Sequence, residues 1–307
     1  MSIKIIKKGL SDRIIDAGRF GFQHLGIQPS GPMDFLSAQL ANTILDNDLN
    51  HPVFELHFPA SSFIFKEDQT ICISGANFVP VLNDKSVAMN TAMHVCKNDT
   101  LHFMQPLLGK TCYLAIKGNI DSSSWLNSKS DFISQIKTND QFNIIAWDAD
   151  INKNSNNPTE QQNQQSIIDK VQKHIFNSNE IRFIPGPQWN DLKNESISNI
   201  LKQPFYTSLN SNRMGYKLKG PSLQLMEEKT YLSSAVTRGT MQLLPNGEVI
   251  VLMANHQTIG GYANIGQIIL VDLPKLVQHK SDTLFHLNLT NVATAHSEYK
   301  QMQQWFS

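Results

Sequence analysis

Short runs of β-branched and aromatic residues, separated by Gly, Asn, Asp and Pro, recur along most of the chain and constrain its fold more than any other feature. Such runs are typical of β-strands, and the residues between them supply the backbone geometry of turns. They are PVFELHFPASSFIF, TICISGA, TLHFMQ, TCYLAIKG and FNIIAWD, followed by KLKG, TYLSSAV, TMQLLPNGEVIVLMA, GQIILVDLP and TLFHLNLT. Closely spaced strands with little helix favour sandwiches or closed barrels, so we expect an all-β fold.

One helix is expected after the segment SGPMD, residues 30–34, which we call the SGPMD segment. Ser30 or Gly31 suits the N-cap, and Pro32 suits the first helical position. Asp34 would then lie in the first turn, where the helix dipole favours negative charge. The apolar positions that follow at helical spacing are Leu36, Leu40 and Ile44.

Other local patterns predict structure in the second half of the chain. Short helices are expected after Pro187 and over Leu273–Gln278. Asn246 and Gly247 follow Pro245 between two apolar runs, and Asn-Gly tolerates the positive φ of a type I′ turn. We therefore expect a β-hairpin there.

A strongly polar stretch divides the chain. Residues 151–166, INKNSNNPTEQQNQQS, contain almost no apolar side chains and cannot bury enough surface to fold alone. The following stretch, IIDKVQKHIF, suits a short amphipathic helix or an extended lead-in. We expect an N-terminal β-barrel lobe over residues 1–150, a polar linker and lead-in over 151–179, and a C-terminal β-barrel lobe over 180–307.

The composition excludes several classes of partner. Lys and Arg together number 26, as do Asp and Glu, and charged residues make up only 17% of the chain. No basic run stands out, so neither nucleic acid nor an anionic membrane is expected as a partner. No stretch approaches the roughly 18 uninterrupted apolar residues of a membrane span, and MSIKIIKKGL at the N-terminus lacks the apolar core of a signal peptide.

The cysteines Cys72, Cys96 and Cys112 are odd in number and have no CxxC spacing. Each lies in or beside an apolar segment. We therefore expect reduced core residues in a cytoplasmic protein.

Motifs for common cofactors are missing from the sequence. Lys110 and Thr111 follow Gly109 as at the end of a phosphate-binding loop, but Met104 stands where that motif requires its first glycine, so a turn between strands is expected. The 10 histidines lack metal-ligand spacing, and no biotinylation site is present. We expect no metal site and no covalent biotin on this chain.

Glu55 and His57 form a compact acid and histidine pair on a predicted strand. Alternation places both on one face, with Phe54, Leu56 and Phe58 on the other. The pair fits either a solvated or barrel-interior face or a functional site.

Polar residues are densest in the second lobe, where SLNSNRMGYKLKG and ANHQTIGGYANIGQ lie beside apolar strands. A bare strand needs neither Arg213 nor Gly215, whereas a site for a carboxylate or phosphate uses both. Arg offers a planar fork of donors, and Gly permits close approach of the backbone. Each loop alone fits an ordinary connection, but two in one lobe favour a polar pocket. The candidate residues are Asn212, Arg213, Tyr216, His256, Gln257, Thr258, Gly260 and Gly261.

A series of segments resembles one known family. In chain order they are DAGRFGFQHLGIQPSGPMD, ELHFPASSFIF, YLAIKGNID, IRFIPGPQW, SNRMGYKLKG, GTMQLLPNGEVIVLMANHQTIGGYANIG and VDLPKLVQ. Their order and content resemble the biotin-dependent carboxyltransferase-like family, also called allophanate hydrolase subunit 2, which includes the KipA proteins and the C component of 5-oxoprolinase. The match covers nearly the whole chain except the polar linker.

The resemblance implies tandem cyclophilin-like β-barrel lobes with few short helices. It also implies a KipI-like B component and a LamB/YcsF-like A component as partners. With them, bacterial members open the lactam 5-oxo-L-proline to L-glutamate at the expense of ATP, whose binding, with Mg, the partners would share. Two alternatives stay open. One is the carboxyltransferase component of a biotin-dependent urea carboxylase/allophanate system, and the other is a KipA-type regulatory protein that binds a KipI-like kinase inhibitor.

If the chain takes part in lactam opening, the resemblance and the polar loops together suggest roles for the candidates. Arg213 would pair with the substrate carboxylate or a phosphate, Tyr216 would close the pocket, and Glu55 would act as a base if it faces the same cleft. Gln257 and Thr258 would orient polar atoms. The chain alone is expected to be inactive or nearly so. The structural motif of the family comprises Ser30, Gly31, Pro32 and Asp34.

The chain departs from the family pattern within the expected pocket. Asn212 replaces an acid before RMGY, and Asn255 and His256 replace the Asp-Arg pair that is common before Gln-Thr. Elsewhere Ile15 replaces a glutamine and Ala263 a proline. The changes at Asn212, Asn255 and His256 remove charge from the expected pocket and leave the exact substrate open.

Overall fold

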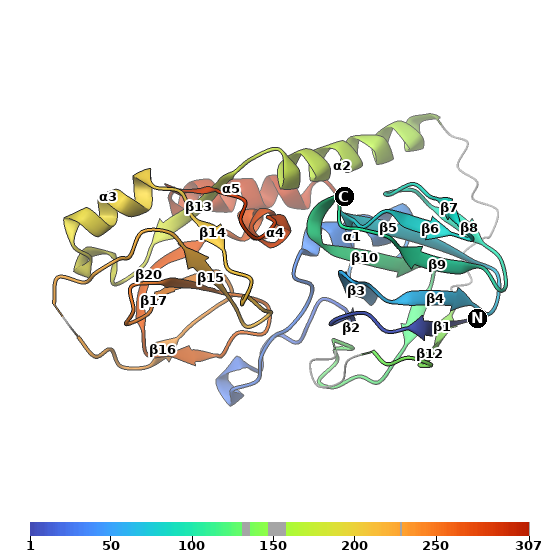
Figure 1. The fold of residues 1–307 in the computed structure, drawn as a ribbon, viewed down its shortest axis with the longest axis horizontal. Coiled ribbons are helices and arrows are strands. Elements are labelled where there is room, and N and C mark those ends of the chain that lie inside the picture. The colour runs from blue at the N-terminus through green and yellow to red at the C-terminus, as the bar shows by residue number, and fades with distance from the viewer. Residues whose placement is uncertain (131–135, 147–157, 228, 307) are drawn as a thin grey trace. The chain divides into compact units, whose positions relative to one another are not determined.

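The computed structural model of the chain describes residues 1–130, 136–146, 158–227 and 229–306 (Figure 1). The chain forms two compact units, which are described separately. The first unit comprises mainly Met1–Gly18 and Asp34–His174, and the second mainly Arg19–Met33 and Ile175–Trp305. Both are built largely of strands, which confirms the all-β prediction.

Two β-sheets form the first unit. One has the strand order β11 (Asn119–Asp121), β12 (Gln141–Ile145), β1 (Ser2–Lys7), β4 (Ser62–Phe65), β9 (Thr100–Phe103), β6 (Pro80–Leu82) and β7 (Lys85–Ser86). The other has the order β2 (Arg13–Ile15), β3 (Val53–His57), β10 (Leu108–Ile116), β5 (Gln69–Asn77) and β8 (Met93–Val95). Neighbouring strands run antiparallel in both sheets.

A single hydrophobic cluster contains side chains from both sheets of the first unit. Phe54 and Leu56 of β3 belong to it, and Phe54 lies edge-on to Phe63 of β4 with ring centroids 5.3 Å apart. Alternation along β3 therefore places Glu55 on the other face of its sheet. Helix α1 (Phe35–Ile44) packs against β5 and β10 (Figure 1).

Asp34 is the N-cap of α1. Its Oδ1 accepts a hydrogen bond from the backbone N–H of Ser37 at 3.1 Å, and its Oδ2 accepts one from the Ser37 hydroxyl at 2.5 Å. The prediction that Ser30 or Gly31 caps the helix and that Pro32 starts it is wrong. Ser30 and Gly31 have φ values of 59° and 93°, whereas an N-cap residue requires an extended backbone. Asp34, with φ −116° and ψ 95°, meets that requirement.

The second unit is organised around one large sheet and a small separate pair of strands. The large sheet has the order β14 (Tyr206–Thr207), β15 (Gly215–Lys219), β18 (Val249–Leu252), β17 (Thr240–Leu243), β20 (Ala263–Ile268), β13 (Glu180–Pro185) and β21 (His286–Leu289). The separate pair is β16 (Ser234–Ala235) with β19 (Ile259–Gly260). The last pairing of the large sheet, β13 with β21, is parallel.

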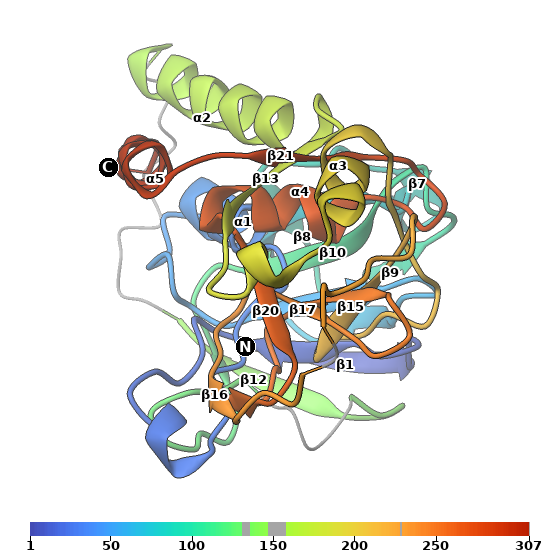
Figure 2. The ribbon, with the colours of Figure 1, turned by 90° about the vertical axis from the view of Figure 1, so that its left-hand side faces the viewer.

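Three helices of more than one turn accompany this sheet among the described residues. They are α3 (Asn194–Lys202), α4 (Leu273–Gln278) and α5 (Val292–Gln303), and three short 3₁₀ turns are η1 (Gln23–Leu25), η2 (Trp189–Asp191) and η3 (Leu270–Asp272). Helix α3 packs beside β21 and α4 beside β13 (Figure 2). The predicted helix over Leu273–Gln278 is confirmed, and η2 and α3 follow Pro187 as expected. Helix α5 was not predicted.

The hairpin between β17 and β18 is confirmed, but its turn type is not. The backbone N–H of Gly247 donates to the carbonyl of Leu244 at 2.9 Å, and that of Leu244 donates to the carbonyl of Glu248 at 2.8 Å. Gly247 alone has a positive φ, of 82°. A type I′ turn needs positive φ at Asn246 as well. The loop is therefore a three-residue connection with glycine in the left-handed position.

The stretch expected as a polar linker contains a long helix, α2 (Pro158–Phe176). Residues 151–157 lie outside the described residues. The prediction of an unstructured polar linker is wrong for residues 158–166, because Gln and Glu are good helix formers. Over residues 167–176 the helix agrees with the predicted amphipathic alternative, and Val171 and Ile175 form its buried side. Proline suits the first turn because it has no N–H to leave unpaired.

The predicted domain boundaries differ from the compact units in two places. The first unit extends to His174, inside α2, and Arg19–Met33 is grouped with the second unit although it lies within the first 150 residues. Long-range hydrogen bonds to this segment, described below, give the physical reason. The lobe boundaries at 150 and 180 stay a prediction.

Two cysteines follow expectation, since Cys72 and Cys112 are buried and free. Cys96 is exposed, which corrects its assignment to the core. It lies in the turn after β8, where its backbone N–H donates to Asp99 Oδ2 at 2.8 Å. No helix among the described residues combines the length and apolar character needed to cross a bilayer.

Candidate functional site

Glu55 belongs to a buried hydrogen-bonded network within the first unit. Its Oε2 accepts a hydrogen bond from the Tyr113 hydroxyl at 2.8 Å, and the hydroxyl oxygen accepts one from the backbone N–H of Asp34 at 2.7 Å. Glu55, Tyr113 and Asp34 are all 0% exposed. The network joins β3, β10 and the start of α1.

The chemistry of this network is that of a structural link. Burial, reinforced by the charges of Glu55 and Asp34, raises the pKa of Tyr113 well above its usual range. The hydroxyl therefore stays protonated near neutral pH and donates a hydrogen bond to Glu55. In this network Glu55 Oε2 is occupied as the acceptor of the Tyr113 hydroxyl. Its catalytic role stays a prediction.

Asp12 is a second buried acid near Glu55 that was not predicted. Its Oδ1 accepts from the backbone N–H of His57 at 2.7 Å, and its Oδ2 accepts from that of Ser61 at 2.6 Å. Burial raises the pKa of Asp12 to about 6, and the charge of Glu55 adds to this, although the hydrogen bonds from His57 and Ser61 act in the opposite direction. Its position before a short strand carries no distinctive motif, so only the fold reveals it.

The second unit brings three sequence motifs together around Arg213. Arg213 Nη2 donates to the carbonyl oxygen of Gly31, in the SGPMD segment, at 2.5 Å, and to Asn255 Oδ1 at 3.1 Å. The backbone N–H of Asn255 in turn donates to the carbonyl of Arg213 at 2.8 Å. Arg213 is 9% exposed. The bond to Gly31 connects residues 182 positions apart in the chain and holds the Arg19–Met33 segment to the second unit.

A second arginine, Arg238, also contacts the SGPMD segment. Its Nη2 donates to the carbonyl oxygen of Met33, and its own carbonyl accepts from Gln267 Nε2 at 2.8 Å. Arg238 lies between β16 and β17 and is half-buried. Arg238 was not predicted, because a single arginine in a short Thr-Arg-Gly turn has no motif of its own.

His256 lies beside these arginines and is 2% exposed. Its Nδ1 is 2.6 Å from the carbonyl oxygen of Gln257. Burial lowers the pKa of His256 below its usual 6.5, and the positive charge of Arg238 lowers it further, against the smaller effect of the bond to Gln257. The ring is therefore neutral at pH 7. We call Arg213, Arg238, Asn255 and His256 the arginine–histidine cluster.

The other predicted residues of the two polar loops lie around this cluster in different environments. Gln257 and Thr258 are half-buried, and the Thr258 carbonyl accepts from the backbone N–H of Val236 at 3.1 Å. Gly260 is buried in β19, whereas Gly261 is exposed.

Tyr216 and Asn212 do not join the cluster. Tyr216 is 4% exposed and belongs to the hydrophobic core of the second unit, which disfavours a role in closing a pocket. Asn212 is exposed, and its Oδ1 accepts from the backbone N–H of Met214 at 2.8 Å, which shapes the turn before β15. Their roles toward a substrate stay predictions.

The PGPQ segment contributes a buried amide row in the same unit. Gln188 Oε1 accepts from the backbone N–H of Asn264 at 3.0 Å, and Asn264 Oδ1 accepts from Gln242 Nε2 at 3.1 Å. Gln242 is 0% exposed. A Cβ placed on Gly186 would lie 2.2 Å from the carbonyl oxygen of Asn264, so only glycine allows this approach.

The described residues that were candidates for an ATP–Mg site do not fit one. Lys110 and Thr111 lie within strand β10, not in a turn as predicted, and a phosphate-binding loop must instead lead into a helix. Burial lowers the pKa of Lys110 to about 8. Among the described residues, no group of three or more His, Cys, Asp or Glu side chains is placed to hold a metal ion.

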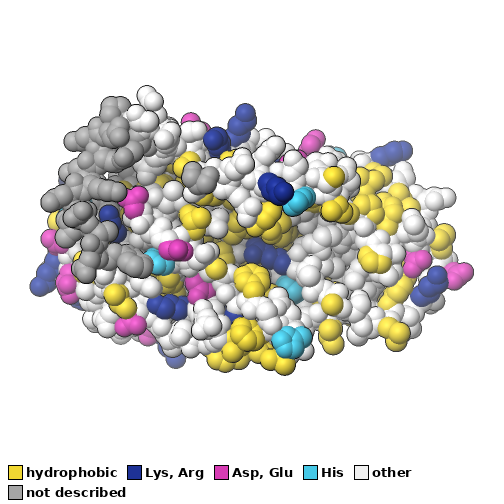
Figure 3. Space-filling view, turned by 180° about the vertical axis from the view of Figure 1, so that it is seen from behind, with side chains coloured by type: hydrophobic (Ala, Val, Ile, Leu, Met, Phe, Trp, Pro, Cys, Tyr) yellow, Lys and Arg dark blue, Asp and Glu magenta, His cyan; other side chains and the backbone are white. Residues whose placement is uncertain are grey.

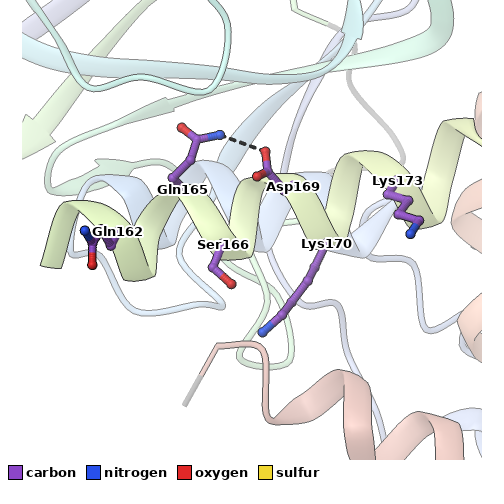
Figure 4. A pocket seen from close by; sticks show the side chains of 6 residues that line it. All are labelled: Gln162, Gln165, Ser166, Asp169, Lys170 and Lys173. Carbon is purple, nitrogen blue, oxygen red and sulfur yellow. Dashed lines mark hydrogen bonds between the residues drawn. The ribbon is translucent and has the colours of Figure 1, made fainter. Parts of the chain in front are cut away.

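A shallow depression of 420 Å³ lies along α2 (Figure 4). The described residues that line it come from this helix, and Gln165 Nε2 donates to Asp169 Oδ1 at 2.8 Å one turn away. Such a surface lacks the converging polar groups of a binding site. On the face drawn in Figure 3, Lys and Arg side chains of the described residues are interspersed with acidic and uncharged ones. The arginine–histidine cluster is therefore the better candidate site.

The chain is similar over most of its length to two bacterial proteins. The chain is 28% identical to the C component of 5-oxoprolinase from Escherichia coli over 305 residues, which cover 99% of this chain and 96% of that protein. It is 30% identical to the C component of 5-oxoprolinase from Haemophilus influenzae over 276 residues, covering 86% and 84% of the two chains.

A solved structure supports the fold. The urea amidolyase of K. lactis matches with a TM-score of 0.86 and 20% identity over 100% of this chain, although the chain spans only 20% of that protein. The model of the family described as carboxyltransferase domain, subdomain A and B, matches residues 25–289. The chain belongs to this carboxyltransferase-domain family.

Proposed function

We propose that this chain is the C component of an ATP-dependent 5-oxoprolinase, which opens 5-oxo-L-proline to L-glutamate. The observation that carries the proposal is the similarity to two proteins named as this component of 5-oxoprolinase, one of them over 99% of this chain. The arginine–histidine cluster supports it, because the substrate carries a carboxylate and arginine is suited to bind that group in two-pronged fashion.

The reaction explains which groups such a site needs. An unstrained lactam resists hydrolysis because its amide carbon is a poor electrophile and its nitrogen a poor leaving group. Donors that stabilise developing negative charge, and a group that accepts a proton from water, lower the barrier. Arg213 and Arg238 are the proposed donors toward the substrate carboxylate or the developing charge, and His256 and Gln257 the proposed polar contacts.

We propose that the chain works with a KipI-like B component and a LamB/YcsF-like A component. We propose that the partners complete the ATP site, because the described residues offer neither a phosphate-binding loop at Gly109 nor a cluster of metal ligands. ATP, with Mg, would therefore be bound with residues of these partners. A cytoplasmic location stays a prediction from the sequence.

Co-expression with the two partners tests this proposal. The assembled complex should release glutamate from 5-oxoproline only when ATP is present. The chain purified alone should show no 5-oxoproline-dependent ATP turnover. Turnover by the single chain would overturn the proposal that partners complete the site, and an inactive complex would overturn the assigned reaction.

A second candidate, the carboxyltransferase component of a biotin-dependent urea system, is favoured by the structural match to urea amidolyase. It requires a biotin carrier encoded elsewhere. Transfer of labelled carboxylate from a biotinylated carrier domain to urea, in the presence of this chain, would establish it in place of lactam opening.

A further inference from the structure

We propose that His256 is the proton acceptor of the ring-opening step, held by its neighbour in the tautomer that leaves Nε2 free of a proton. This rests on the proposed function and adds to it a residue that acts on the reacting water.

The tautomer follows from the partner of Nδ1. A backbone carbonyl oxygen can only accept a hydrogen bond, and that of Gln257 is 2.6 Å from Nδ1. Nδ1 therefore carries the ring proton, and in the neutral ring Nε2 has the lone pair. Within the described residues Nε2 makes no hydrogen bond, so this acceptor is available to a ligand or water.

The surroundings keep the ring neutral. His256 is 2% exposed, and Arg238 is the charged group whose field acts on it, while Arg213 is bound to the adjacent residue Asn255. Burial and the field of Arg238 both disfavour a positive charge on the ring, so the pKa of His256 lies below 6.5. A neutral imidazole with a fixed acceptor nitrogen is the form that a general base needs near pH 7.

The chain's departure from the family pattern gives this position a new chemistry. Where the resemblance leads us to expect an arginine, this chain has His256. Arginine stays charged and only donates, whereas a neutral histidine can take up a proton. The neighbouring arginines still supply positive charge for a carboxylate.

The step conserves atoms and charge. ATP, bound with residues of the partners, would supply the activation of the lactam that this step requires. The oxygen of water bonds to the lactam carbonyl carbon while one water proton passes to Nε2. The carbon–nitrogen bond of the ring then breaks, and the departing nitrogen takes that proton back from Nε2. The products are the carboxylic acid and the amine of an open-chain amino acid, and His256 returns to its neutral form.

The first test reads the tautomer directly on the full chain without its partners. Long-range ¹H–¹⁵N spectra of histidine-labelled protein, assigned by the loss of signals in His256→Gln, report which nitrogen is protonated as the pH is varied. We expect a proton on Nδ1 and titration below pH 6.5. A proton on Nε2 in the neutral ring, or a pKa above 6.5, would overturn the proposal. His286→Gln, at an exposed position of β21, is the matched control and should leave the His256 signals in place.

The second test uses the assembled complex. We expect His256→Gln to lower kcat by at least about a hundredfold, the lower end for loss of a general base, with little change in KM. The fall of wild-type kcat/KM at acidic pH should be absent from the residual activity of the variant. If His256→Gln keeps its activity and its kcat/KM still falls at acidic pH, the role of His256 would be overturned while the proposed function would stand. An inactive wild-type complex would overturn both.

Discussion

Replacing Arg213 with lysine measures what the arginine contributes to the second unit. Its Nη2 bonds the carbonyl of Gly31 at 2.5 Å and Asn255 Oδ1 at 3.1 Å, with the side chain 9% exposed. Lysine keeps the charge but has a single ammonium group in place of the planar fork, so it cannot reproduce both bonds from one position.

The magnitude follows from the bonds that are lost. A hydrogen bond from a charged donor contributes roughly 1.5–3 kcal/mol, and the variant loses at least one. For a unit of this size each kcal/mol shifts the melting temperature by about 2–4 °C. We therefore expect Arg213→Lys to lower the melting temperature of the second unit by about 3–12 °C.

Scanning calorimetry of the purified chain is the assay, because it can resolve the transitions of two units. Met214→Leu is the matched control, since Met214 is the next residue, is 51% exposed, and should leave both transitions unmoved. An unchanged melting temperature in Arg213→Lys would refute the view that these bonds anchor the Arg19–Met33 segment.

The same variant also tests a role toward substrate. In the assembled complex, at a temperature where the variant is folded, loss of two-pronged carboxylate binding should lower kcat/KM by about ten- to a hundredfold, which corresponds to one charge-assisted bond. Full activity would restrict Arg213 to its structural role.

Two further substitutions test the buried acid and the close backbone contact. Folding raises the pKa of Asp12 from 3.8 to about 6, so the folded state favours the protonated carboxyl group. This protonation stabilises the folded state fully below pH 3.8. The stabilisation, up to about 3 kcal/mol, is lost as the pH rises through 6. Urea unfolding between pH 4 and 7 should show this fall in the wild type and in the exposed control Asp84→Asn but not in Asp12→Asn, and a flat wild-type profile would contradict it. Gly186→Ala should lower the free energy of unfolding by more than about 2 kcal/mol, because the new Cβ would lie 2.2 Å from the Asn264 carbonyl oxygen. Gly261→Ala is the control. Its nearest contact is at 3.3 Å, so it should unfold at nearly the wild-type urea concentration. Equal midpoints for the two glycine variants would show that the backbone at Gly186 yields.

Several elements of the fold could be predicted because they depend on neighbours in the chain. Alternation along β3 places Phe54 and Leu56 in the core and Glu55 on the other face. The apolar spacing of Leu273–Gln278 predicts α4 with its observed bounds. These patterns can be recognised in the sequence because the local backbone geometry of a strand or helix fixes how often a side chain points to the buried face.

Other elements could not be read from local pattern. Ser30 and Gly31 have a left-handed backbone, so α1 begins later, with Asp34 as its N-cap. The residue types alone do not predict this backbone conformation. Residues 158–166 resemble a linker in composition, so the first half of α2 could not be predicted, whereas the apolar spacing of IIDKVQKHIF fits the second half.

The candidate site shows the same division. Residue type and spacing are enough to establish the mostly β architecture, the family, and the polar loops that contain Arg213 and His256. The folded chain was needed to show that Arg213 bonds Gly31 and that Arg238 joins the same cluster. Folding also encloses Glu55 beneath Tyr113 and places Tyr216 in the core. Hydrogen bonds between residues far apart in the chain depend on how strands pair and pack, and no local period of the sequence encodes that pairing.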